Sequence, residues 1–144
     1  MKLLKTTIHH KVLIRVPREQ VYAAMTTPEG LDAWFTNGTV KEKGKLHLRW
    51  KNWGPDKVTT ESKNSPILED NPPERFVFKW WMDTPNPTTV EMDFLEHKEG
   101  TLLKLKEFGY EDTEEGHNRF EECAVGWGEA LTLLKFYCEY GLTY

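Results

Sequence analysis

The 144-residue sequence contains only two cysteines, Cys123 and Cys138, and both fall within one predicted helix. Their spacing in an intact helix corresponds to roughly 22 Å at a rise of 1.5 Å per residue. A disulfide requires Cα atoms within about 7 Å of each other, so the two thiols cannot pair there. Their spacing also fits neither a metal motif nor a redox pair. Free thiols are typical of a reducing cytoplasm.

The sequence also lacks a basic block and a long apolar run. Its net charge is −4, so the electrostatic footprint of a nucleic-acid-binding protein is missing. No stretch approaches the ~20 apolar residues of a membrane span. Residues 1–17 show neither the uninterrupted apolar region nor the cleavage site of a signal peptide. We therefore expect a cytoplasmic protein with no nucleic-acid partner and no membrane insertion.

The motifs of the common catalytic and cofactor sites are absent as well. There is no glycine-rich phosphate loop, no Gly-x-Ser-x-Gly and no Cys-x-x-Cys. His9 and His10 are adjacent, so in a strand they point to opposite faces and cannot readily chelate one metal ion. His47 falls on the polar face of its strand. The sequence therefore predicts no metal, no cofactor and no assigned catalytic residue.

Aromatic residues, by contrast, are abundant. They make up 12% of the chain and include six tryptophans, although the hydrophobic fraction is only 38%. A protein with this composition must bury most of its tryptophans in a core or use them in a pocket.

The apolar pattern predicts one domain over residues 1–144. Strands are expected at 5–16, 45–51, 57–69, 76–82, 90–94 and 101–107, with the polar, Thr-rich segment 57–69 as an edge or weakly packed strand. Helices are expected at 17–27, 28–35 and 114–140. Thr113 or Asp112 can cap the last helix, and Gly141 is a natural stop.

Short turns between the consecutive strands favour an antiparallel meander. The inward faces of the strands are apolar, and so is one face of the last helix, so each must cover the other. We predict an α+β fold in which a curved antiparallel sheet of about six strands grips the long C-terminal helix. Two short helices follow the first strand.

Two features point toward the gap between sheet and helix. Glu107 shares the face of Leu103 and Leu105, so it is either a buried carboxylate or a solvated residue at the rim if the strand ends at Lys106. An inward Glu107 could bind a ligand or act as a general base, although a lone carboxylate does not make an enzyme. The second feature is an aromatic set that either interlocks as a core or lines a cavity: Trp34, Trp50, Phe78, Trp80 and Trp127. Trp53 and Trp81 are expected outside or at an edge.

Several segments together resemble the START-related helix-grip superfamily, often labelled SRPBCC. They are VPREQVYAAMTTPEGLDAWF (16–35), GKLHLRW (44–50), PPERFVFKWW (72–81), GTLLKLKEFGYED (100–112) and VGWGEALTLLKFY (125–137). The combination spans nearly the whole chain. It is similar to the subfamily related to the C-terminal domain of the activator of the heat-shock chaperone ATPase.

The resemblance implies a six- or seven-stranded sheet, two short helices and a cavity under the long helix. Members bind lipids, polyketides, flavonoid-like molecules or hormones, and some are cyclases. Carried over residue by residue, the ligand-binding positions are Trp34, Trp50, Phe78, Trp80, Met92, Glu107, Trp127 and Leu131.

Three functions follow from these observations. The first is binding of an apolar or aromatic small molecule between sheet and helix. The second is a protein-interaction module, with a chaperone ATPase as partner and a role in the stress response. The sequence carries no added N-terminal chaperone-binding domain, which favours the first over the second. The third is a cyclase- or hydrolase-type enzyme that uses Glu107. Family membership alone does not choose among them.

Overall fold

The computed structural model describes residues 1–143, which form one antiparallel sheet and three helices. The strands are β1 (Ile8–Ile14), β2 (Val40–Glu42), β3 (Lys45–Trp53), β4 (Val58–Asn71), β5 (Arg75–Trp80), β6 (Thr88–His97) and β7 (Gly100–Phe108). The helices are α1 (Arg18–Thr26), α2 (Pro28–Trp34) and α3 (Glu114–Tyr140). The predicted α+β class, the short helix pair and the long C-terminal helix are therefore confirmed.

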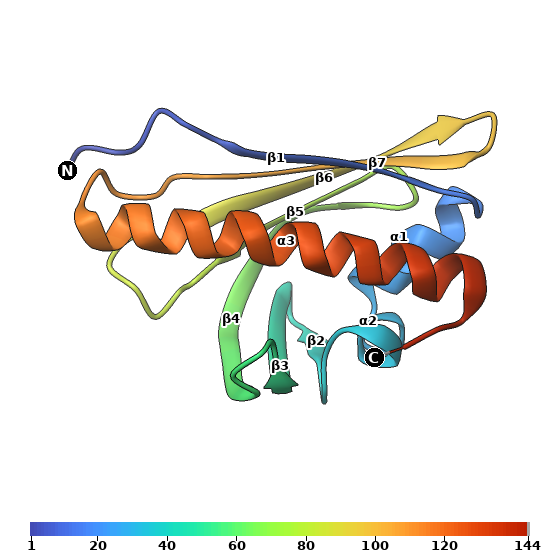
Figure 1. The fold of residues 1–144 in the computed structure, drawn as a ribbon, viewed down its shortest axis with the longest axis horizontal. Coiled ribbons are helices and arrows are strands. Elements are labelled where there is room, and N and C mark those ends of the chain that lie inside the picture. The colour runs from blue at the N-terminus through green and yellow to red at the C-terminus, as the bar shows by residue number, and fades with distance from the viewer. Residues whose placement is uncertain (144) are drawn as a thin grey trace.

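The sheet order is β1-β7-β6-β5-β4-β3-β2, so β2 to β7 form a meander and β1 pairs with β7. Helix α3 crosses one face of this sheet, with α1 and α2 near its C-terminal end (Figure 1). The sheet has seven strands rather than about six because of β2. Its three residues pair with β3 across Lys43 and Gly44, which both have positive φ. A strand this short carries too few residues for an alternating pattern.

Strand β4 corrects one prediction. Segment 57–69 was expected to be either an edge strand or a weakly packed one. The edge alternative is wrong, because β4 pairs with β3 on one side and β5 on the other. Most of its side chains are nevertheless exposed. The polar composition of β4 therefore correlates with the exposure of its side chains. It does not indicate whether the strand is central or at the edge of the sheet.

The ends of α3 lie where the sequence predicts them. The Thr113 hydroxyl accepts a hydrogen bond from the Gly116 N–H at 3.0 Å, which satisfies one of the free donors of the first turn. At the other end Gly141 adopts a left-handed conformation with φ 69°, and its N–H donates to the Tyr137 carbonyl at 2.8 Å. Both cysteines are free.

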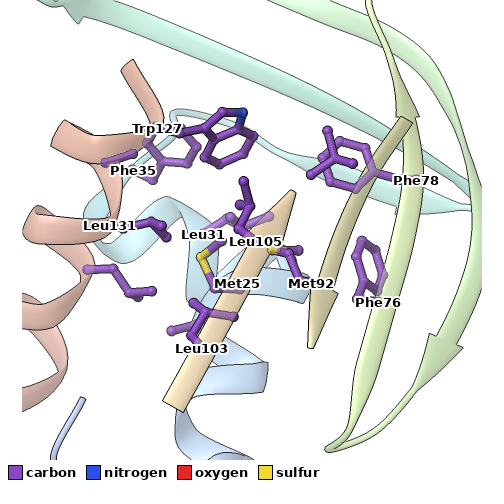
Figure 2. Close-up of a cluster of buried hydrophobic side chains, with 14 of the residues drawn as sticks. Met25, Leu31, Phe35, Phe76, Phe78, Met92, Leu103, Leu105, Trp127 and Leu131 are labelled. Atoms are coloured by element: carbon purple, nitrogen blue, oxygen red, sulfur yellow. The ribbon is translucent and has the colours of Figure 1, made fainter. Parts of the chain in front are cut away.

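The face of the sheet under α3 forms the hydrophobic core. Figure 2 shows side chains from α1, α2, α3 and the central strands meeting in this layer. Its buried members include Met25, Leu31, Phe76, Phe78, Met92, Leu103, Leu105 and Leu131. Full burial of such a side chain stabilises the fold by about 1.5–3 kcal/mol. The middle of the gap between sheet and helix is therefore filled by protein.

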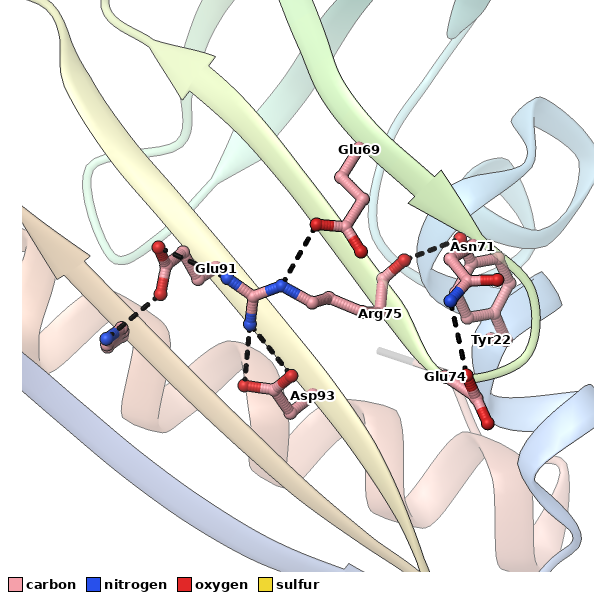
Figure 3. A network of polar contacts seen from close by, with 8 residues as sticks. Tyr22, Glu69, Asn71, Glu74, Arg75, Glu91 and Asp93 are labelled. Carbon is pink, nitrogen blue, oxygen red and sulfur yellow. Dashed lines mark hydrogen bonds and ion pairs between the residues drawn. The ribbon is translucent and has the colours of Figure 1, made fainter.

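The opposite face of the sheet is polar. Arg75 on β5 lies among carboxylates of the neighbouring strands, with Asp93 at 2.8 Å, Glu69 at 3.2 Å and Glu91 at 3.3 Å (Figure 3). The bond to Asp93, and the negative charge around it, raise the pKa of Arg75. Cross-strand pairs of this kind suit a solvated face. The apolar face of the sheet is therefore the one under α3. Within residues 1–143, no helix has both the length and the apolar content needed to span a membrane.

Candidate functional site

An open cavity of about 280 Å³ lies between α3 and the sheet, at the end of β5. Six aromatic side chains contribute to its wall: Phe35, Trp50, Trp53, Trp80, Trp81 and Trp127. Val58 and Thr60 of β4 line it as well. Helix α3 contributes Glu122, Cys123, Gly126 and Ala130. The cavity is thus an aromatic space at one end of a core that is otherwise filled.

Trp80 is the centre of the aromatic wall. Its ring stacks on Trp81 with centroids 4.8 Å apart and planes 7° apart, and it meets Trp127 edge-on at 4.9 Å and 66°. The ring of Trp50 lies 6.2 Å from that of Trp80, with an angle of 26° between their planes. Such pairs contribute about 0.5–1.5 kcal/mol each beyond their buried area. The rings therefore hold one another in place and present a preformed surface.

Phe35 continues this wall from the C-terminal end of α2. It meets Trp50 at 5.5 Å and Trp53 at 5.1 Å, both in edge-to-face geometry. Trp34, its neighbour in sequence, stacks on Phe35 from behind at 4.7 Å and 13°. Trp34, the last residue of α2, therefore lies behind the wall and does not line the cavity.

The prediction for Trp53 and Trp81 is wrong. Both were expected outside or at an edge, yet both are half-buried and line the cavity. Trp81 follows the last residue of β5 and has φ 59°, so strand alternation stops before it. The positive φ turns its ring back onto Trp80, where an alternating strand would have pointed it away.

The structure divides the eight predicted ligand-binding residues. Trp50, Trp80 and Trp127 line the cavity. Five others do not line it: Trp34, Phe78, Met92, Glu107 and Leu131. Phe78, Met92 and Leu131 pack into the core, and the Trp34 indole N–H donates to the Ala24 carbonyl at 2.9 Å. The binding role of all eight residues stays a prediction.

Glu107 is fully buried, so the alternative of a solvated position at the rim is wrong. Three donors meet its carboxylate. Thr88 of β6 and Tyr110, beyond the end of β7, both donate to Oε2 at 2.6 Å. The Trp127 indole of α3 donates to Oε1 at 2.8 Å. The side chain therefore joins three separate parts of the chain, immediately behind the cavity wall.

Burial dominates the electrostatics around Glu107. Loss of solvent raises the pKa of its carboxyl group, while the bonds from Thr88, Tyr110 and Trp127 work in the opposite direction. Burial likewise raises the pKa of the Cys123 thiol to about 11, with the charge of Glu107 as the next cause. A neutral thiol is a poor nucleophile, so Cys123 acts here as part of the wall.

Glu107 makes its three hydrogen bonds to protein groups and does not line the cavity. A general base must lie within hydrogen-bond reach of the proton that it removes. The geometry therefore gives no support to the enzymatic hypothesis for Glu107. In residues 1–143, no group of three or more His, Cys, Asp or Glu side chains is placed to hold a metal ion.

Sequence reasoning missed several wall residues, among them Phe35, Val58, Thr60 and Gly126. Gly126 carried a usable signal, because a glycine inside a helical pattern costs stability and therefore suggests a packing or functional reason. It precedes Trp127 directly, on the helix that covers the sheet. Val58 and Thr60 carried no such signal, because their strand is polar and mostly exposed and its sequence shows no buried face at these positions.

Comparison with solved structures finds the same fold in several bacterial proteins. Protein SSP2350 from Staphylococcus saprophyticus is 23% identical, with a TM-score of 0.74 and 96% of each chain covered. The Aha1 dimer from Colwellia psychrerythraea is 19% identical, with a TM-score of 0.75, 94% of this chain and 98% of that chain covered. DynU16 from the dynemicin biosynthetic locus is 16% identical, with a TM-score of 0.78. The match covers 96% of this chain and 49% of the DynU16 chain.

Among curated proteins, no sequence matches the chain significantly. The sequence profile of one family, described as Activator of Hsp90 ATPase homolog 1-like protein, matches residues 15–139. This match runs from the end of β1 nearly to the end of α3 and includes all the elements that enclose the cavity. The chain belongs to the Activator of Hsp90 ATPase homolog 1-like family.

Proposed function

We propose that the protein binds an uncharged, flat aromatic molecule in the cavity between α3 and the sheet. The observation that carries this proposal is the wall of six aromatic side chains around a space of about 280 Å³. Ligand sites are concave and mostly apolar, with few polar groups that fix orientation. Rigid rings present large contact areas at low entropic cost, and a flat ligand can match them face to face or edge to face.

The size and charge of the cavity narrow the ligand class. An apolar cavity of roughly 150 Å³ accommodates one benzene ring, so 280 Å³ suits a molecule of two or three rings. Among the described lining residues, Glu122 is the charged one, and its carboxylate disfavours an anionic ligand. Both points favour a neutral ring system over a fatty acid. The occurrence of the same fold in a protein of the dynemicin biosynthetic locus agrees with a small-molecule role.

Fluorescence titration tests the proposal directly, because five of the six lining aromatics are tryptophans. The probes are flavone, N-phenyl-1-naphthylamine and palmitate. We expect saturable quenching by the two neutral ring compounds and weaker binding of palmitate. No saturable signal from any of the three would contradict the proposal.

A matched pair of variants locates the binding site. Trp34 and Trp127 are equally buried, at 4% exposure each, and each indole donates one hydrogen bond. Only Trp127 lines the cavity. Trp127→Phe should therefore weaken flavone binding, whereas Trp34→Phe should leave it near the wild-type value. Equal losses in both variants would indicate a general effect on the fold.

Interaction with a chaperone ATPase is a second candidate function. It is favoured by apolar side chains on the outer side of α3, where Val125 is 73%, Phe136 45% and Tyr140 65% exposed. Exposed apolar groups gathered on one helix can mark a protein contact. The test is the ATP turnover of the host chaperone with and without the protein. Turnover that stays flat at saturating protein would rule this function out.

A further inference from the structure

Trp127 connects the cavity to the buried carboxylate behind it. Its ring lines the cavity and meets Trp80 edge-on at 4.9 Å, and its indole nitrogen donates to Glu107 Oε1 at 2.8 Å. An indole has a single donor and no acceptor, so this bond fixes the edge of the ring. Whatever holds Glu107 in place therefore also sets the orientation of the wall.

We propose that Glu107 is a positioning residue of the cavity, whose ionised carboxylate holds the Trp127 ring in its ligand-binding orientation, so that ligand affinity falls when Glu107 is protonated. This inference rests on the proposed function and names the group that regulates the same site. Glu107 does not touch the ligand in this scheme. It acts through Trp127.

The three donors explain why ionisation matters. An ionised carboxylate accepts from Thr88, Tyr110 and Trp127 at the same time. A protonated carboxyl group must place its own hydrogen, and the donor-only indole cannot accept it. The hydrogen therefore competes with the two hydroxyls at Oε2, and the bond from Trp127 becomes one between neutral groups. Charge-assisted bonds are roughly twice as strong as neutral ones.

The titratable groups around Glu107 come from few elements. Helix α3 contributes Arg119, whose charge favours the ionised form, and Cys123; Tyr110 follows β7. The residues paired with Glu107 are apolar, Ile8 on β1 and Val90 on β6. Further along β1, His10 is hydrogen-bonded to the Ala124 carbonyl of α3 at 2.9 Å.

Burial keeps the pKa of Glu107 above its ordinary value, so protonation is expected above the range of a solvated glutamate. By reciprocity, a ligand that binds better to the ionised form also lowers the pKa of Glu107. Ligand binding at mildly acidic pH would then release a proton. Two measurements as a function of pH test the proposal: the resonance of the Trp127 indole N–H and the affinity for the ligand.

The indole ¹H–¹⁵N resonances provide the first readout, without any ligand. Trp127→Phe assigns the Trp127 signal by its disappearance. In the wild type we expect this signal to move as the pH falls from 8 to 4.5, and in Glu107→Gln we expect it to stay fixed. Tyr110→Phe, which removes a donor to Oε2 and leaves the indole bond, serves as the control that retains the titration. A Trp127 signal that titrates identically in wild type and Glu107→Gln would show that Glu107 does not cause the change and would overturn the proposal.

Flavone affinity over the same pH range provides the second readout. We expect the wild type to lose about threefold to tenfold in affinity on acidification, and Glu107→Gln to show a weakened affinity that hardly changes with pH. Equal, pH-independent affinities in the two proteins would overturn the coupling. If no protein binds flavone, the proposed function and the affinity part fall together, while the indole signal still decides whether Glu107 positions Trp127. Should Glu107→Gln fail to fold, an indole signal that does not move with pH in the wild type overturns the proposal.

Discussion

Gly126 offers the sharpest test of the cavity, because it lines the space from the middle of α3 and a Cβ built there meets no atom within 4 Å. Glycine inside a helix costs about 1 kcal/mol relative to alanine, and leucine is nearly as favourable as alanine. Gly126→Ala should therefore stabilise the fold by about 1 kcal/mol. Gly126→Leu should add part of the roughly 1.5–3 kcal/mol available from burying its side chain, since the cavity is open.

The two substitutions should differ in ligand binding. The leucine side chain enters the cavity, so Gly126→Leu should lower flavone affinity by more than tenfold, which is more than about 1.4 kcal/mol. Gly126→Ala adds only a methyl group and should bind nearly normally. Stability is followed by thermal unfolding, where 1 kcal/mol corresponds to about 4 °C in a domain of this size. Flavone affinity is followed by tryptophan quenching.

Gly128 supplies the matched control on the same helix. Its Cβ would lie 3.3 Å from His10 Cε1, and it does not line the cavity. Gly128→Ala should thus leave flavone affinity unchanged whatever it does to stability. The reasoning would be refuted by a folded Gly126→Leu protein that binds flavone as tightly as the wild type, because the ligand would then occupy another place.

Three further predictions concern stability. The pKa of Glu107 is raised above 4.5 in the fold, so the unfolded chain ionises first and stability falls as the pH rises from about 4.5 to the folded pKa. The free energy of unfolding of Glu107→Gln minus that of the wild type should therefore increase over this range in urea titrations, and a constant difference would contradict the assignment. Thr113→Ala removes the cap of α3 and should cost about 0.5–2 kcal/mol in urea denaturation, with Thr113→Ser as the conservative control. Gly30→Ala places a Cβ 1.9 Å from the Ala23 carbonyl oxygen, so α1 and α2 must separate, and we expect a lower Tm than for Gly126→Ala by well over 4 °C. Equal melting temperatures would show that this close approach is easily relieved.

Much of the fold is readable from the sequence because its signals are local. The alternation in residues 101–107 and the apolar stripe of α3 each define a buried face without reference to the rest of the chain. Thr113 and Gly141 mark the ends of α3 through the backbone groups next to them. Strand β2 could not be predicted from its own sequence. It has only three residues, and its stability comes from pairing with β3.

The cavity is less predictable because it depends on where regular structure stops. Trp81 reaches the cavity through a positive φ just after β5, and Phe35 lines it from the position directly after α2. Alternation and helical periodicity describe side chains within an element and fail at its ends. Phe78 and Leu131, which lie within β5 and α3, accordingly pack into the filled core, whereas Phe35, Trp53 and Trp81 line the cavity from the ends of their elements.

Glu107 has one feature that the sequence predicts, the face on which it lies, and one that it does not, the set of its hydrogen-bond partners. Its face follows from alternation along β7, but its partners come from β6, the segment after β7 and α3. No local pattern connects Thr88, Tyr110 and Trp127, so the sequence leaves open whether the carboxylate is buried or solvated. Removing the carboxylate alone would strand three buried donors, at about 1–3 kcal/mol for each. The four groups therefore form a unit whose members cannot be replaced singly without loss. An apolar core would fill the same place without buried polar groups, so the proposed positioning of Trp127 gives a reason for this arrangement.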